Sequence, residues 1–194
     1  MLAYIFWHWP LGHIDSGNYE SMLADFHRTL SLHPPAGLHG SMVIRQEGAS
    51  WLPPARVTYE DWYCLDGSAS LDTLNEAAVS GACLAPHTLV ARAAEGGHGG
   101  LYRLRVGAGQ GASLRFAGWF GKPAGMSYRE IYRIIGEIDA GGGIELWERQ
   151  MVLGPAPEFC LLLPEPVELP EAFAPSWLER FTVVVAAPVE PLRG

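Results

Sequence analysis

Two histidines and an aspartate lie close together near the N-terminus, and these residue types carry out acid–base or metal chemistry. His8 ends an apolar segment, and His13 and Asp15 follow Pro10 in a polar loop. Because imidazole titrates near neutral pH and also binds metal ions, a histidine pair beside a carboxylate is a candidate for either role. The alternative is that His8 packs beside its two tryptophan neighbours while His13 is solvated. The spacing matches no compact ligand motif, so we expect no metal site.

Arginines and tryptophans on predicted strands form a second set of candidates. Glu145, Trp147 and Arg149 alternate along one segment, so they share a strand face, and Arg45 is the counterpart of Arg149 in the first half. Arginine can grip a ligand carboxylate with two parallel hydrogen bonds, and flat indole rings such as Trp62 can clamp a planar ligand. The alternative is that the arginines neutralise nearby carboxylates and the tryptophans fill a core.

The other histidines and the glycine-rich segments give weaker signals. His27 follows Phe26 on a predicted helix but lies off its apolar stripe, so we expect it to face solvent. His87 and His98 are expected in loops. The segments EGGHGG and GAGQG match neither a P-loop nor a dinucleotide fingerprint and are expected to be turns. No G-x-S-x-G, HExxH, CxxC or CxxCH motif occurs, so the sequence identifies no nucleophile.

Length and composition exclude several classes of protein. The chain has 194 residues, of which 48% are hydrophobic, so it is not a disordered chain. Its net charge of −8 gives no electrostatic reason to bind a nucleic acid backbone. The apolar N-terminus lacks the cationic start of a signal peptide, and no apolar run is long enough to cross a bilayer. We therefore expect a cytoplasmic protein that has neither nucleic acid nor membrane as a partner.

The spacing of apolar residues predicts a β-α-β-β-α-β order in the first half of the chain. Strands are expected over residues 2–9, 40–46, 56–65 and 101–106. The first strand is apolar on both faces, so both faces must be covered. Helices are expected to begin at caps provided by Asn18 and Ser70. The first helix carries an apolar stripe of Tyr19, Met22, Leu23, Phe26 and Leu30.

The second half repeats this plan. Strands are expected over residues 114–120, 144–152, 159–161 and 181–186. Ser127 and Glu130 form a capping box at the start of a helix, and a shorter helical piece is expected over residues 175–179. The apolar stripe of the second-half helix aligns without a gap on that of the first helix, as Tyr128, Ile131, Tyr132 and Ile135 on Tyr19, Met22, Leu23 and Phe26.

Several such matches in the same order predict an internal duplication. The halves would be residues 1–107 and 112–194, joined by a glycine-rich segment at 108–111. The alternative is a chance similarity imposed by shared secondary structure. A four-stranded sheet with both helices on one face leaves an apolar face that a second sheet can cover. We therefore predict an α+β fold in which two antiparallel, ferredoxin-like halves form a barrel within one chain.

This order of elements resembles the dimeric α+β barrel superfamily, in a form with the two barrel halves fused. The resemblance covers essentially the whole chain but consists of element order, without signature residues. The superfamily includes small monooxygenases acting on quinone-type substrates, haem-dependent chlorite dismutases and peroxidases, and lactone isomerases. The resemblance implies a pocket either between sheet and helices or within the barrel, and it identifies no catalytic residue.

Three hypotheses for function follow, and the residues leave open whether the protein is an enzyme. The first is that the chain, without a cofactor, binds a small apolar or aromatic acid in a barrel pocket. The second is a non-catalytic binding or assembly module with a filled barrel. The third is a haem- or metal-dependent oxidoreductase, and an oligomer is compatible with all three. The candidate ligand-binding residues are His8, Trp9, His13, Arg45, Trp62, Trp147 and Arg149.

Overall fold

The computed structural model describes all residues except 54–56, 110, 112–113, 140–141 and 188–194. Parts of three predicted features therefore lie outside the described residues. They are the start of a strand at residue 56, the joint at 108–111, and the ends of the second half at 112 and 194. The described part is an α+β fold with antiparallel strands, as the sequence predicts, but one continuous sheet takes the place of the two that were expected. No helix in this part of the chain is long and apolar enough to cross a membrane.

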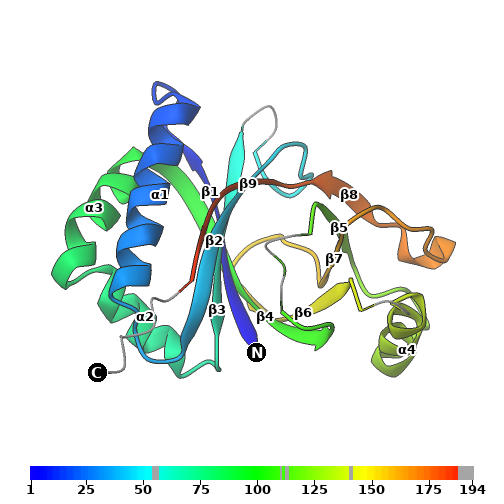
Figure 1. Ribbon diagram of the computed structural model, residues 1–194. Helices are drawn as coiled ribbons and strands as arrows, with labels where there is room; N and C mark the ends of the chain where they lie inside the picture. The colour runs from blue at the N-terminus through cyan, green and yellow to red at the C-terminus, as the bar shows by residue number, and fades with distance from the viewer. Residues whose placement is uncertain (54–56, 110, 112–113, 140–141, 188–194) are drawn as a thin grey trace.

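The sheet has nine strands, and its two ends come together. Its order is β8-β5-β7-β6-β4-β1-β3-β2-β9. The strands are β1 (Leu2–Pro10), β2 (Leu38–Gln46), β3 (Thr58–Leu65), β4 (Ala94–Val106), β5 (Phe116–Phe120), β6 (Glu145–Val152), β7 (Phe159–Leu163), β8 (Ser176–Glu179) and β9 (Phe181–Ala186). The end strands β8 and β9 are consecutive in the chain and separated by Arg180 alone, so the sheet curves into a nearly closed barrel (Figure 1).

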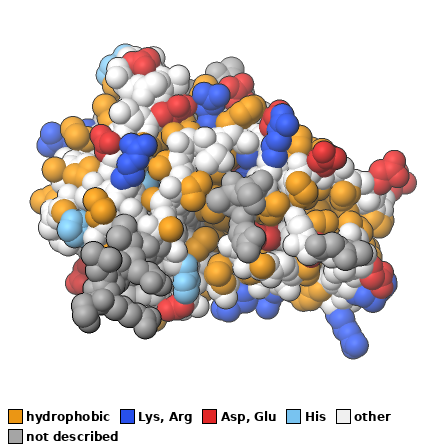
Figure 2. All heavy atoms as spheres, in the orientation of Figure 1, with side chains coloured by type: hydrophobic (Ala, Val, Ile, Leu, Met, Phe, Trp, Pro, Cys, Tyr) orange, Lys and Arg blue, Asp and Glu red, His pale blue; other side chains and the backbone are white. Residues whose placement is uncertain are grey.

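Four α-helices among the described residues cover the outside of the barrel. They are α1 (Ser16–Leu32), α2 (Ser70–Ala78), α3 (Leu84–Ala93) and α4 (Tyr128–Ile138). Figure 1 shows α1, α2 and α3 on one side of the barrel and α4 on the other. On the face seen in Figure 2, basic side chains are scattered among acidic and apolar ones.

The helix starts confirm one predicted cap and correct another. The capping box of Ser127 and Glu130 is present at the start of α4. In α1 the cap is Asp15, whose carboxylate accepts a hydrogen bond from the backbone N–H of Asn18 at 3.0 Å. The prediction that Asn18 is the cap was therefore wrong. The carboxylate of Asp15 satisfies the free N–H of Asn18 from just outside the helix, three residues earlier in the chain.

The inside of the barrel is filled by large side chains from both sides. Trp7, Trp62, Trp119 and Trp147 are all buried there. The rings of Trp62 and Trp147 lie edge to face, with centroids 5.6 Å apart. A buried carboxyl group accompanies these rings: Glu60 accepts hydrogen bonds from the indole N–H groups of Trp7 and Trp62, at 3.0 and 2.9 Å. Aromatic packing therefore stabilises the contact between the two sides of the sheet.

Strands replace the predicted structure in two segments, and His87 and His98, expected in loops, lie in α3 and β4. The EGGHGG segment forms the first part of β4, hydrogen-bonded to β1. Glycines are tolerated there because aromatic rings from β1 lie over them: a Cβ added to Gly96 would come within 2.7 Å of the ring of Trp9. Residues 176–179, predicted as helical, form β8, because pairing with β5 satisfies their backbone.

Candidate functional site

A cavity of about 330 Å³ lies on the outer face of the sheet, between strands β1, β3 and β4 and helices α1 and α3. This volume falls within the range of about 300–1,000 Å³ that is usual for small-molecule sites. The polar side chains that line the cavity belong to His8, Tyr19, Asp61, Tyr63, His87 and Glu95. An adjoining cavity of about 170 Å³ shares the rings of Phe6 and Phe26 with it. The two together form an elongated, largely apolar space.

The glycines of β4 explain why this part of the sheet is hollow. Gly97 lies opposite His8 in the β1–β4 ladder, and Gly99 lies opposite Phe6. Directly opposed residues point to the same side of a sheet, so β4 contributes no side chain beside His8 and Phe6. A Cβ at Gly97 would lie 2.6 Å from Cζ of Phe6. Side chains in place of these glycines would displace the rings that line the cavity.

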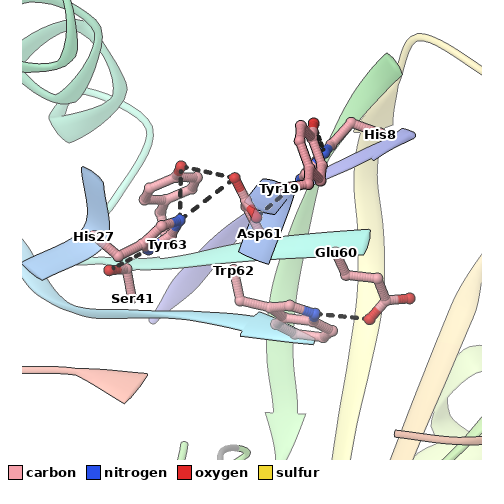
Figure 3. A network of polar contacts seen from close by, with 8 residues as sticks. All are labelled: His8, Tyr19, His27, Ser41, Glu60, Asp61, Trp62 and Tyr63. Atoms are coloured by element: carbon pink, nitrogen blue, oxygen red, sulfur yellow. Dashed lines mark hydrogen bonds and ion pairs between the residues drawn. The ribbon is translucent and has the colours of Figure 1, made fainter. Parts of the chain in front are cut away.

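The carboxylate of Asp61 is at the centre of a buried network of polar groups (Figure 3). Its Oδ1 lies 3.0 Å from Nε2 of His8, and its Oδ2 lies 3.4 Å from Nε2 of His27. The hydroxyl of Tyr63 donates to the same Oδ2 at 3.2 Å. The second nitrogen of each imidazole meets a hydroxyl: Nδ1 of His8 lies 2.7 Å from Tyr19, and Nδ1 of His27 lies 2.8 Å from Ser41.

Strand alternation places these groups on the same face. In β3, Glu60 points into the barrel, and its neighbour Asp61 points outward toward the helices. Tyr63, two residues later, shares the face of Asp61. His8 comes from the end of β1, and Tyr19 and His27 come from α1, which packs on this face. The network therefore joins two strands and one helix across the cavity wall.

Burial and the neighbouring imidazoles act in opposite directions on Asp61. Burial would raise the pKa of its carboxyl, but His8 and His27 together hold the pKa below its ordinary value. The carboxylate is therefore ionised at neutral pH. Burial, followed by the charge of Asp61, raises the pKa of Tyr19, so this phenol keeps its proton.

This arrangement can move a proton at the cavity. If Nε2 of His8 carries hydrogen and donates to Asp61, then Nδ1 accepts a hydrogen bond from the Tyr19 hydroxyl. An ionised carboxylate holds the imidazole in this tautomer and stabilises the imidazolium that forms when a second proton arrives. Tyr19, His8 and Asp61 all line the cavity, so the three form a candidate acid–base unit.

The seven residues predicted from sequence are not brought together. Only His8 lines the cavity on the outer face. His13 is exposed in the turn before α1, and Asp15 caps that helix. The expected grouping of His8, His13 and Asp15 therefore does not form. Trp9 is partly buried at the edge of the barrel core and lies over Gly96.

The other predicted residues have partners elsewhere. Trp62 and Trp147 lie in the filled barrel interior. Arg45 lies 3.2 Å from a carboxylate oxygen of Glu20, and Arg149 donates to a backbone carbonyl. For all four, contact with a ligand stays a prediction.

His27 contradicts the expectation that it faces solvent, because it is fully buried. It follows Leu23 by four residues, and residues four apart lie on the same helix face. Counting the apolar stripe from Leu23 instead of Met22 would have placed His27 inside. The sequence also contains a pattern that could have identified Asp61 as a functional residue. The pair Glu60–Asp61 interrupts a strand that is otherwise apolar and buried, and a charge in such a strand needs partners on its own face.

Among the residues that the structure describes, no group of three or more His, Cys, Asp or Glu side chains converges as a metal site. The two oxygens of Asp61 face different imidazoles.

A scan of known protein families finds no match to this sequence, and a search of curated proteins finds none either. Solved structures do match. One is an anthrone oxidase-like protein, with a TM-score of 0.55 and 10% identity, over 98% of this chain and 94% of the other. Another is a "putative monooxygenase" from Lactobacillus acidophilus NCFM, with a TM-score of 0.56 and 11% identity, over 96% of each chain. At this identity the matches speak for the fold alone, and they agree with the α+β barrel predicted from the order of elements.

Proposed function

We propose that this protein binds a planar, largely apolar small molecule in the cavity on the outer face of the sheet and removes a proton from it. The observation that carries this proposal is the unit of Tyr19, His8 and Asp61 at the cavity wall, with 2.7 and 3.0 Å between successive groups. Such a chain of phenol, imidazole and carboxylate can move a proton at the cavity wall. It supports general base catalysis at an adjoining cavity.

The proton would enter at Tyr19. As the phenol oxygen takes a proton from the ligand, its own proton passes to Nδ1 of His8. Asp61 stabilises the resulting imidazolium through Nε2. The raised pKa of Tyr19 disfavours a free phenolate, so the two transfers are concerted. The ligand is left as an anion held in an apolar cavity.

The shape and lining of the cavity favour an aromatic ligand with an acidic C–H or O–H group. The rings of Phe6 and Phe26 offer flat faces. One structural neighbour is described as anthrone oxidase-like and another as a "putative monooxygenase". For an anthrone, loss of a proton gives an electron-rich anion that can reduce dioxygen. One oxygen atom then becomes the new carbonyl of the quinone, and the other leaves as water together with the two hydrogens lost from carbon.

The barrel interior is filled by side chains, which favours the hypothesis that this part of the molecule is a scaffold and binds no ligand. The tryptophans there pack against one another and against buried charges. We propose that Trp62 and Trp147 are structural and that ligand binding is confined to the outer cavity.

We infer further that the two halves arose by duplication of a ferredoxin-like unit. Within the first half the strands lie in the order β4-β1-β3-β2, and the first four strands of the second half lie in the order β8-β5-β7-β6, while its fifth strand, β9, pairs with β2 of the first half. Counted along each half, both orders read fourth, first, third, second. This agreement supports the proposal.

The test uses anthrone as the probe and oxygen uptake as the readout. Wild-type protein should bind anthrone and accelerate its oxidation to the quinone. Tyr19→Phe and His8→Gln should each lower the rate by about 10²–10⁴-fold, the usual contribution of general acid–base catalysis. His13→Gln is the matched control, since His13 is exposed in the turn before α1, and it should leave the rate unchanged. Equal rates for wild type, Tyr19→Phe and His8→Gln would refute the proposed roles.

A further inference from the structure

We infer that the ligand is an aromatic ketone and that His87 of α3 donates a hydrogen bond to its oxygen while Tyr19 takes the proton. This inference rests on the proposed function and deepens it by naming the class of ligand. Proton removal leaves a negative charge in a largely apolar cavity. Such a charge needs a hydrogen-bond donor at the atom where it accumulates.

The other polar side chains that line the larger cavity are unsuited to this role. His8 and Tyr19 contact each other within the acid–base unit, and the hydroxyl of Tyr63 donates to a carboxylate of the network. Two further lining residues are acids, whose carboxylates accept hydrogen bonds and donate none. Among the described residues, the side-chain donor that remains at this cavity is that of His87.

The imidazole of His87 is held in place and still has a donor to offer. It lies in the first turn of α3, half-buried, and packs edge to face on the ring of Phe26 with centroids 5.5 Å apart. Within the part of the chain that the structure describes, it forms no hydrogen bond. A neutral imidazole carries one N–H group in either tautomer, so this ring can donate to a ligand.

The position of His87 along the site indicates where the ligand oxygen lies. The rings of His8, Phe6 and Tyr4 follow one another along β1, with centroids 5.5 and 6.4 Å apart. His8 lines the larger cavity only, Tyr4 lines the smaller cavity only, and Phe6 lines both. His87 also lines both cavities, so we place it at the level of Phe6, one ring further along the site than His8.

This spacing selects the class of ligand. A carbonyl oxygen that lies across one ring from the acidic carbon would reach His87 when that carbon meets Tyr19. Anthrone has this arrangement, because its carbonyl and its CH₂ group occupy opposite positions of the central ring. An aromatic hydrocarbon has no oxygen for His87, and a ketone with its oxygen beside the acidic carbon would direct it elsewhere.

The hydrogen bond strengthens as the proton leaves. The C–H bond of the ligand breaks, its proton goes to the Tyr19 oxygen, and the electron pair moves through the ring to the carbonyl oxygen. That oxygen becomes the enolate oxygen, and His87 keeps its own proton throughout. A hydrogen bond to a charged oxygen is stronger than one to a ketone, so His87 favours the anion over the bound ketone. It would therefore be a second catalytic residue.

The test measures anthrone-dependent oxygen uptake by variants of His87. His87→Leu and His87→Ala should each lose about 10-fold or more in kcat, because one donor to the developing oxyanion is gone. His87→Gln keeps an N–H donor and should recover much of the rate. His33→Gln is the matched control, since His33 is exposed and lines neither cavity, and it should match the wild type.

Binding of unreactive probes separates a missing hydrogen bond from a damaged cavity. Anthraquinone carries a carbonyl oxygen and anthracene does not, although both are planar and have three fused rings. In His87→Leu, the Kd of anthraquinone should rise by about 3–10-fold, the usual contribution of one hydrogen bond. The Kd of anthracene should be unchanged. Titration followed by fluorescence measures both.

The outcomes separate the two proposals. If wild type oxidises anthrone, and His87→Leu has the same kcat and the same affinity for anthraquinone, the role of His87 is overturned and the proposed function stands. An equal loss of affinity for both probes would make His87 a structural residue and overturns its role as well. If His87→Leu does not fold, His87→Ala decides in its place. A wild-type protein that neither binds nor oxidises anthrone overturns the proposed function and this inference with it.

Discussion

Replacing Asp61 with asparagine tests the network most simply, because the side chain keeps its shape and loses its charge. Asp61 is buried and accepts contacts from three groups, His8, His27 and Tyr63. Asparagine has one oxygen and one NH₂ group. In either orientation, its NH₂ group faces a group that donates to the carboxylate in the native protein, so at least one buried donor loses its acceptor.

The expected loss of stability is large. Removing one partner from a buried, hydrogen-bonded ionic network costs about 3–5 kcal/mol. For a chain of this length, each kcal/mol corresponds to about 2–4 °C in Tm, so Asp61→Asn should lower the Tm by about 10 °C. Urea unfolding should show the same loss as a lower midpoint with an unchanged slope.

The effect should depend on pH with a defined sign. The pKa of Asp61 is lower in the folded chain than its ordinary value of 3.8. The stability that this carboxylate contributes is therefore complete above about pH 4 and is lost as the pH falls below that value. The difference in unfolding free energy between wild type and Asp61→Asn should be largest at pH 7 and smaller at pH 3.

Asp66→Asn is the matched control, because Asp66 also pairs with a histidine but is exposed. Its effect should be within about 1 kcal/mol of zero at every pH, as is usual for exposed ion pairs. If Asp61→Asn is no more destabilising than Asp66→Asn at pH 7, the network does not hold the charge that we assign to it.

Three further substitutions test the positions of glycine and of buried charge. Gly97→Ala should lower the free energy of unfolding by about 1–3 kcal/mol and weaken anthrone binding, because its Cβ would lie 2.6 Å from Phe6. Gly136→Ala in α4 meets open space and should stabilise the chain by up to about 1 kcal/mol. Urea unfolding of both variants checks this, and a destabilised Gly136→Ala or a neutral Gly97→Ala would contradict it. Arg180→Met removes a buried guanidinium that donates to two backbone carbonyls and lies over Trp62, so we expect a loss of about 3 kcal/mol. Calorimetry checks this loss, and an unchanged Tm would show that the charge is dispensable inside the barrel.

Much of the fold follows from local sequence patterns. The apolar stripe of α1, the capping box of α4 and the aromatic alternation of β1 each depend on neighbouring residues, and each predicts its element. The glycine-rich start of β4 could not be predicted in this way. Its stability comes from rings on another strand that cover it, and that pairing is not local. Helix α3 was missed because Pro86 suggests a break, although proline is tolerated in a first turn.

The candidate site was predictable only in part. His8 was a candidate because it is a histidine at the end of a predicted strand. Its partners, Tyr19 and Asp61, lie 11 and 53 positions further along the chain. No spacing rule connects residues that meet through sheet pairing and helix packing. The adjacent acids of β3 were the usable signal, since two neighbouring charges in a buried strand must be satisfied on opposite faces.

A crystal structure of the protein grown with anthrone tests the central claim most directly. The account predicts a planar molecule on the outer face of the sheet, between Phe6 and Phe26, with its acidic position within hydrogen-bonding distance of the Tyr19 oxygen. A ligand bound among the tryptophans inside the barrel, or an outer cavity that stays closed at saturating anthrone, would contradict it.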